Sequence, residues 1–113
     1  MSSVLPQILT AGDFWRLPQN GTRRELIRGE VKEIMPPGGQ HGAIAVTLAM
    51  LLRLWTQRGG GGYVGVEAGY LLAHDPDTVR GPDVSYVRAD RIPPSGIPEG
   101  FWNLAPDLAV EVV

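Results

Sequence analysis

The sequence predicts an α+β (α/β) fold, in which one main helix packs across a β-sheet. Three observations support this class: one long run has helical periodicity, several shorter runs alternate between apolar and polar residues, and Gly- or Pro-containing turns separate them. A length of 113 residues suits a single domain over residues 1–113, long enough to bury roughly two-thirds of its unfolded surface. There is no internal repeat and no linker-like boundary.

Composition narrows the functional classes. The residues are 43% hydrophobic and 19% charged, which is typical of a soluble globular protein, and the longest apolar run is too short to cross a membrane. Cysteine is absent, which excludes disulfides and thiolate metal sites and is compatible with the cytoplasm. The first residues lack the features of a secretory signal. The net charge of −2, with nine arginines and a single lysine, argues against non-specific nucleic-acid binding.

The first third of the chain predicts a short helix and a hairpin. The stretch 10–13 can cap a short helix that runs through Phe14 and Trp15 to Leu17 and is stopped by Pro18. Two alternating runs, 23–27 and 30–35, are separated only by Arg28 and Gly29, which predicts a β-hairpin.

The run 40–57 predicts the main helix. Its apolar residues recur at the spacing of one buried stripe: Ile44, Leu48, Leu51, Leu52 and Trp55. The four glycines at 59–62 lack the Lys-Ser/Thr of a phosphate-binding loop, so they are interpreted as a flexible connection. The later strands are predicted at 63–68, 70–72, 84–87 and 108–113, with a proline-rich surface loop over 88–100.

Two acids stand out in these strands. Asp83 follows Gly81-Pro82 at the start of an apolar strand, and Glu111 interrupts the apolar run 108–113. Buried carboxylates are rare without a partner, and a shared divalent cation would offset their repulsion. We therefore expect Asp83 and Glu111 to lie on adjacent strands and to bind one metal ion. Two simpler interpretations remain open: Asp83 caps a turn, and Glu111 pairs with an arginine such as Arg80.

Four motifs in order resemble the Uma-two family of bacterial endonucleases, which belongs to the PD-(D/E)XK, restriction-endonuclease-like superfamily. They are 25–30, His41 at a helix start, 80–84 and 106–112. The resemblance runs from about residue 25 to residue 113. It implies a mixed sheet flanked by helices, DNA as the partner, and hydrolysis of DNA phosphodiester bonds with Mg²⁺ or Mn²⁺.

The resemblance also implies roles for individual residues. Asp83 and Glu111 match the two acids of the family motif, as metal ligands and catalytic residues, and Glu30 and His41 match catalytic positions near the same site. The lysine expected two residues after Glu111 is Val113 here. The resemblance implies that the family lysine is displaced to a later helix, which we expect this chain to lack.

We therefore expect a domain that lacks its C-terminal part and forms homo-oligomers. The alternative function is a catalytically inactive, truncated nuclease fold with a binding or assembly role. A weaker alternative is a metal-dependent hydrolase acting on a substrate other than DNA.

Overall fold

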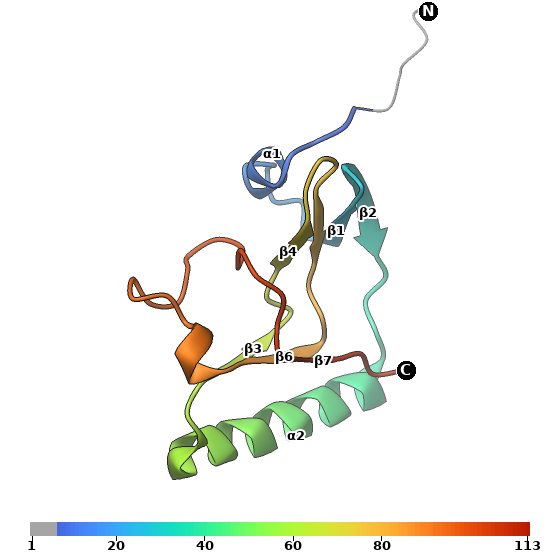
Figure 1. Cartoon of the computed structure of the whole chain (residues 1–113). Helices are drawn as coiled ribbons and strands as arrows, with labels where there is room; N and C mark the ends of the chain where they lie inside the picture. The colour runs from blue at the N-terminus through green and yellow to red at the C-terminus, as the bar shows by residue number, and fades with distance from the viewer. Residues whose placement is uncertain (1–6) are drawn as a thin grey trace, which may run out of the picture.

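The computed structural model describes residues 7–113 (Figure 1). Two α-helices are present, α1 (Ala11–Trp15) and α2 (Gly39–Trp55), and α2 continues into a π-helical turn over Thr56–Gly60. The strands are β1 (Arg23–Ile27), β2 (Glu30–Ile34), β3 (Tyr63–Val66), β4 (Tyr70–Ala73), β5 (Thr78–Arg80), β6 (Val84–Val87) and β7 (Leu108–Val110). The α+β class is confirmed, but the strands form two antiparallel sheets instead of one.

The four-stranded sheet has the order β2-β1-β5-β4. The predicted hairpin is confirmed, with Arg23 opposite Ile34 at one end and Ile27 opposite Glu30 at the turn. Both turn residues have positive φ, as a tight hairpin turn requires. The short helix α1 is held by a capping box between Thr10 and Asp13, and its Phe14 packs with Leu26 and Val79 in the core of this sheet.

The three-stranded sheet has the order β3-β6-β7, and every residue of the central strand β6 is buried. The chain passes from one sheet to the other between β5 and β6, through Gly81, Pro82 and Asp83. A Cβ atom on Gly81 would lie 2.8 Å from the Glu67 carbonyl oxygen, so only glycine fits this close crossing. Asp83 is thereby fixed where the two sheets meet.

Helix α2 lies along the three-stranded sheet, away from the hairpin (Figure 1). The helix is confirmed, but the prediction that its whole apolar stripe is buried is wrong. Only Ala45 is buried, whereas Ile44 and Trp55 are 49% and 52% exposed. Four further large apolar residues of α2 are also exposed: Val46, Met50, Leu51 and Leu54. A three-stranded sheet is too narrow to cover a helix that is apolar on all sides.

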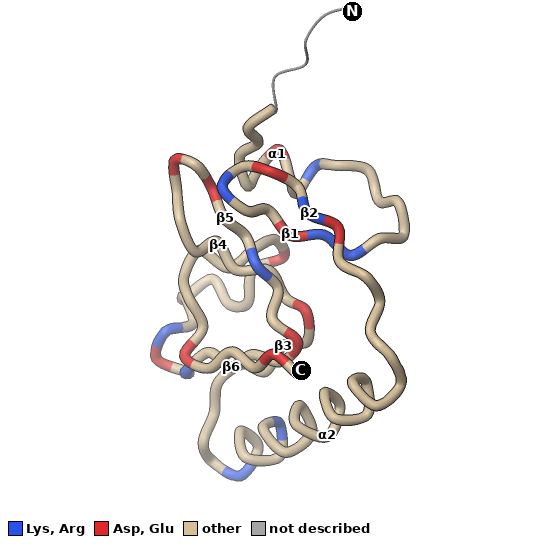
Figure 2. Tube along the Cα trace, turned by 90° about the vertical axis from the view of Figure 1, so that its right-hand side faces the viewer, with Lys and Arg blue, Asp and Glu red and all other residues tan. Residues whose placement is uncertain are grey.

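Figure 2 shows how little charge α2 carries; Arg53, near its end, is the sole charged residue between its bounds. No helix in the described part of the chain combines the length and apolarity that crossing a bilayer requires. The last predicted strand, 108–113, is shorter than expected and ends at Val110. Glu111 therefore follows the strand instead of interrupting it.

Candidate active site

Asp83 is the most enclosed acid of the site, with a side chain only 7% exposed. Its Oδ2 lies 2.9 Å from Nε2 of His41, in the first turn of α2, and accepts the Val112 backbone N–H at 2.8 Å. Its Oδ1 lies 3.4 Å from a guanidinium nitrogen of Arg23 on β1. Three elements that are distant in sequence therefore converge on one carboxylate.

These contacts also set the charge of Asp83. Burial by itself favours the neutral acid and raises the pKa of Asp83. The Val112 N–H, the His41 ring and the Arg23 guanidinium act in the opposite direction and together bring the pKa below its ordinary value. Asp83 is therefore ionised at neutral pH.

Glu111 lies beside Asp83 because of the strand register. Val84 pairs with Val110 in the antiparallel ladder between β6 and β7, so the next residues outward are Asp83 and Glu111. The Asp83 backbone N–H donates to Glu111 Oε1 at 3.1 Å. The prediction that the two acids occupy adjacent strands is confirmed, with each acid placed just beyond its strand end. Both line one cavity of about 290 Å³.

Glu25 is a further acid at this site, and the sequence analysis did not single it out. Its Oε2 accepts the Gly81 backbone N–H at 2.9 Å, and its Oε1 lies 3.8 Å from Arg80. Glu25 lines the cavity that Asp83 and Glu111 line. The signal was present in the alternation of β1, where Arg23 and Glu25 share the face opposite to buried Leu26.

Glu30 is not brought to Asp83. It lies at the turn end of the hairpin, whereas Arg23, which contacts Asp83, lies at the other end of β1. Four residues of strand separate these ends by about 13 Å. The carboxylate of Glu30 lies 3.3 Å from the ammonium group of Lys32, the only lysine of the chain. The role that the resemblance implies for Glu30 stays a prediction.

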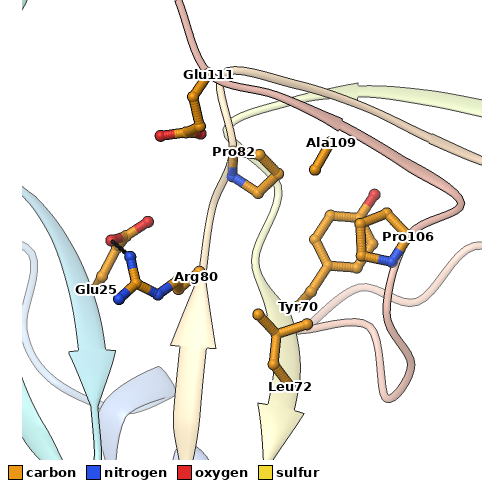
Figure 3. Close-up of a pocket in the computed structure, with 8 residues that line it drawn as sticks. All are labelled: Glu25, Tyr70, Leu72, Arg80, Pro82, Pro106, Ala109 and Glu111. Carbon is orange, nitrogen blue, oxygen red and sulfur yellow. Dashed lines mark ion pairs between the residues drawn. The ribbon is translucent and has the colours of Figure 1, made fainter.

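A second cavity, of about 180 Å³, adjoins the first and shares Glu25 and Glu111 with it (Figure 3). In Figure 3 the carboxylates of Glu25 and Glu111 and the guanidinium of Arg80 lie at one side. The other side is apolar and is formed by Tyr70, Leu72, Pro82, Pro106 and Ala109.

Comparison with known proteins identifies the family. The family model Uma2, described as "Putative restriction endonuclease", matches residues 11–113. The chain belongs to the Uma2 family. The resemblance seen in the motifs is thus confirmed. None of the curated proteins compared with the chain matches it.

The Uma2 chain also has a counterpart among solved structures. A protein from Anabaena variabilis ATCC 29413, described as "a putative nuclease belonging to DUF820", superposes with a TM-score of 0.77 at 23% identity. The match covers 93% of this chain and 58% of the Anabaena chain. At this level of identity the likeness establishes a shared fold. The Uma2 chain thus spans little more than half the length of that protein.

The donor set of the Uma2 site suits a hard divalent cation, because it offers carboxylate oxygens from Asp83, Glu111 and Glu25. Residues 7–113 nonetheless contain no group of three or more His, Cys, Asp or Glu side chains placed to hold a metal ion. Both Asp83 oxygens already have protein partners, Oδ2 in His41 and Val112 and Oδ1 in Arg23. Glu111 Oε1 accepts the Asp83 N–H. The structure thus places the Asp83 and Glu111 carboxylates at one cavity, but shows no complete set of metal ligands among the described residues.

Proposed function

We propose that this Uma2 domain hydrolyses DNA phosphodiester bonds with Mg²⁺ or Mn²⁺ held by Asp83 and Glu111. The observation that carries the proposal is the hydrogen bond from the Asp83 N–H to Glu111, which brings both carboxylates to one cavity at a sheet end. Membership of a family described as restriction endonucleases supports DNA as the substrate class. Absence of cysteine makes the cytoplasm the proposed location.

A divalent cation in such a site polarises a phosphate oxygen and lowers the pKa of a bound water. The residues of the chain then have separate tasks. Asp83 and Glu111 supply anionic oxygen ligands. His41 holds the Asp83 carboxylate from the start of α2, so we assign it a positioning role.

We assign to Arg23 the cationic role that a lysine has in the family motif. Val113 stands two residues after Glu111, where the motif has a lysine, and Lys32 lies with Glu30 at the distant hairpin turn. Arg23 contacts Asp83, and a guanidinium stays protonated at any working pH. The Arg23 guanidinium is therefore placed to stabilise negative charge that develops on a phosphate. Glu25, which lines the same cavity, is assigned an assisting role beside the one that the resemblance implies for Glu30.

Metal binding tests the site separately from catalysis. Mn²⁺ affinity is measured by the loss of the free-ion signal in electron paramagnetic resonance. Asp83→Asn and Glu111→Gln remove one negative ligand each and should weaken binding at least tenfold. Glu99→Gln is the matched control, since it removes the same charge from an exposed residue that lines neither cavity. Wild-type affinity in Asp83→Asn, with circular dichroism unchanged, would overturn the assignment.

The second candidate function is assembly without catalysis, and the exposed apolar side of α2 favours it. Six large apolar residues of this helix are exposed, and a surface of this kind marks an interaction site. We propose a second copy of the chain as the partner, because a face with almost no charge can meet its own image without repulsion. Sedimentation velocity should show a dimer that Met50→Glu dissociates. If the wild-type protein sediments as a monomer at about 100 µM, this proposal is excluded.

A further inference from the structure

The apolar cavity beside the acidic site has no role in the function proposed above. It begins at Pro82, the residue before Asp83, and shares Glu25 and Glu111 with the acidic cavity (Figure 3). A group in this cavity therefore lies beside the site at which the proposed function places a phosphate. This continuity links the two cavities as parts of one binding surface.

The volume limits the occupant to one ring-sized group. About 180 Å³ is below the roughly 300–1,000 Å³ of pockets for drug-sized ligands. It is close to the engineered cavity of about 150 Å³ that accepts benzene. The side chains of Leu72, Pro106 and Ala109 offer apolar contacts to a small, flat group.

The charges at the edge of the cavity restrict the occupant further. The carboxylates of Glu25 and Glu111 disfavour an anion inside it, and their oxygens can accept N–H donors from a neutral ring. Arg80 lies at the same edge, 55% exposed and 3.8 Å from Glu25. It is placed to contact a phosphate outside the cavity. A neutral ring with N–H groups, flanked by phosphates, is the chemistry of a nucleotide in a DNA strand.

We propose that this cavity binds the nucleobase next to the phosphate held at Asp83 and Glu111. The inference rests on the proposed nuclease function and deepens it. A base inside the protein cannot remain stacked and paired in a duplex. The domain therefore binds single-stranded or frayed DNA in preference to fully paired DNA.

The test measures DNA binding in Ca²⁺ by fluorescence anisotropy, independently of cleavage. The probes are a single-stranded thymidine 12-mer labelled with fluorescein, an abasic strand of the same length and a paired duplex. For wild type, the 12-mer should bind at least about tenfold more tightly than the other two, in line with burying the apolar surface of one ring.

Ala109→Phe fills the cavity from β7, and Ala105→Phe is the matched control on the exposed loop just before it. Ala109→Phe should bind the 12-mer and the abasic strand alike, whereas Ala105→Phe should keep the wild-type difference. Equal binding of both strands by wild type overturns the pocket without any variant. So does an Ala109→Phe variant that retains the difference.

Plasmid nicking in Mn²⁺ by the same proteins separates the two proposals. If wild type nicks DNA but Ala109→Phe behaves like Ala105→Phe in binding, the nucleobase pocket is wrong and the nuclease function stands. If wild type neither binds nor nicks DNA, the nuclease function is wrong and the pocket proposal is overturned with it.

Discussion

We expect the hydrogen bond between Tyr70 and Ser85 to stabilise the packing of the two sheets against each other. Tyr70 belongs to β4 of the four-stranded sheet and Ser85 to β6 of the three-stranded sheet. Their hydroxyl oxygens lie 2.7 Å apart, and both residues are fully buried. Burial raises the pKa of the Tyr70 hydroxyl above its ordinary value, so this group remains a neutral hydrogen-bonding partner.

The expected effects follow from what each substitution leaves unpaired. Tyr70→Phe leaves the Ser85 hydroxyl with only a long contact, 3.5 Å to the Gly65 carbonyl oxygen. Ser85→Ala leaves the Tyr70 hydroxyl buried without its partner. Each should lower the free energy of unfolding by about 1–3 kcal/mol. The double variant should lose less than the sum, with a coupling of about 1 kcal/mol, because neither hydroxyl is then left alone.

Urea unfolding of the four proteins, followed by circular dichroism, measures this coupling. The slope of the unfolding free energy against urea should be the same in all four, which makes the midpoints comparable. Additive losses, with a coupling within about 0.3 kcal/mol of zero, would show that the pair does not join the sheets.

Two further predictions concern stability. Hydrogen bonds and ion pairs lower the pKa of four aspartates, Asp13, Asp77, Asp83 and Asp107, against the opposing effect of burial. These aspartates contribute fully to the free energy of unfolding above their unfolded pKa of about 3.9, and the contribution is lost as the pH falls through their lower folded pKa values. A urea midpoint that does not change from pH 5 to pH 2 would contradict this. The second prediction concerns two glycines. Gly69→Ala should destabilise the folded protein by about 1–3 kcal/mol, because the added Cβ would lie 2.5 Å from the Phe101 ring. Gly42→Ala, in open space on α2, should stabilise it by roughly 0.5–1 kcal/mol, and equal thermal midpoints for the two variants would refute the packing argument.

Local sequence patterns predicted the elements well where they carried their own signals. The hairpin turn at Arg28-Gly29 and the periodicity of α2 are examples. The short strand β5 was missed, because three residues give too little alternation to recognise and its pairing with β1 and β4 is set by tertiary contacts. The exposure of α2 was also mispredicted, because periodicity identifies an apolar face but does not show what covers it.

The site was predicted in part for a similar reason. Asp83 and Glu111 each interrupt an apolar pattern, so both could be recognised as candidates from the sequence. The β6–β7 register brings them together. Arg23 and Glu25 belong to an ordinary alternating strand, and their approach to Asp83 depends on how the hairpin is placed against the sheet junction. Glu30 occupies the same hairpin, but the register carries it to the opposite end.

Plasmid nicking in Mn²⁺ tests the central claim most directly, with wild type, Asp83→Asn and Glu99→Gln prepared in parallel. We expect nicking by wild type and by Glu99→Gln, and loss of nicking in Asp83→Asn. Equal nicking by wild type and Asp83→Asn would contradict the two-carboxylate site, and absence of nicking in all three would contradict catalysis by this chain.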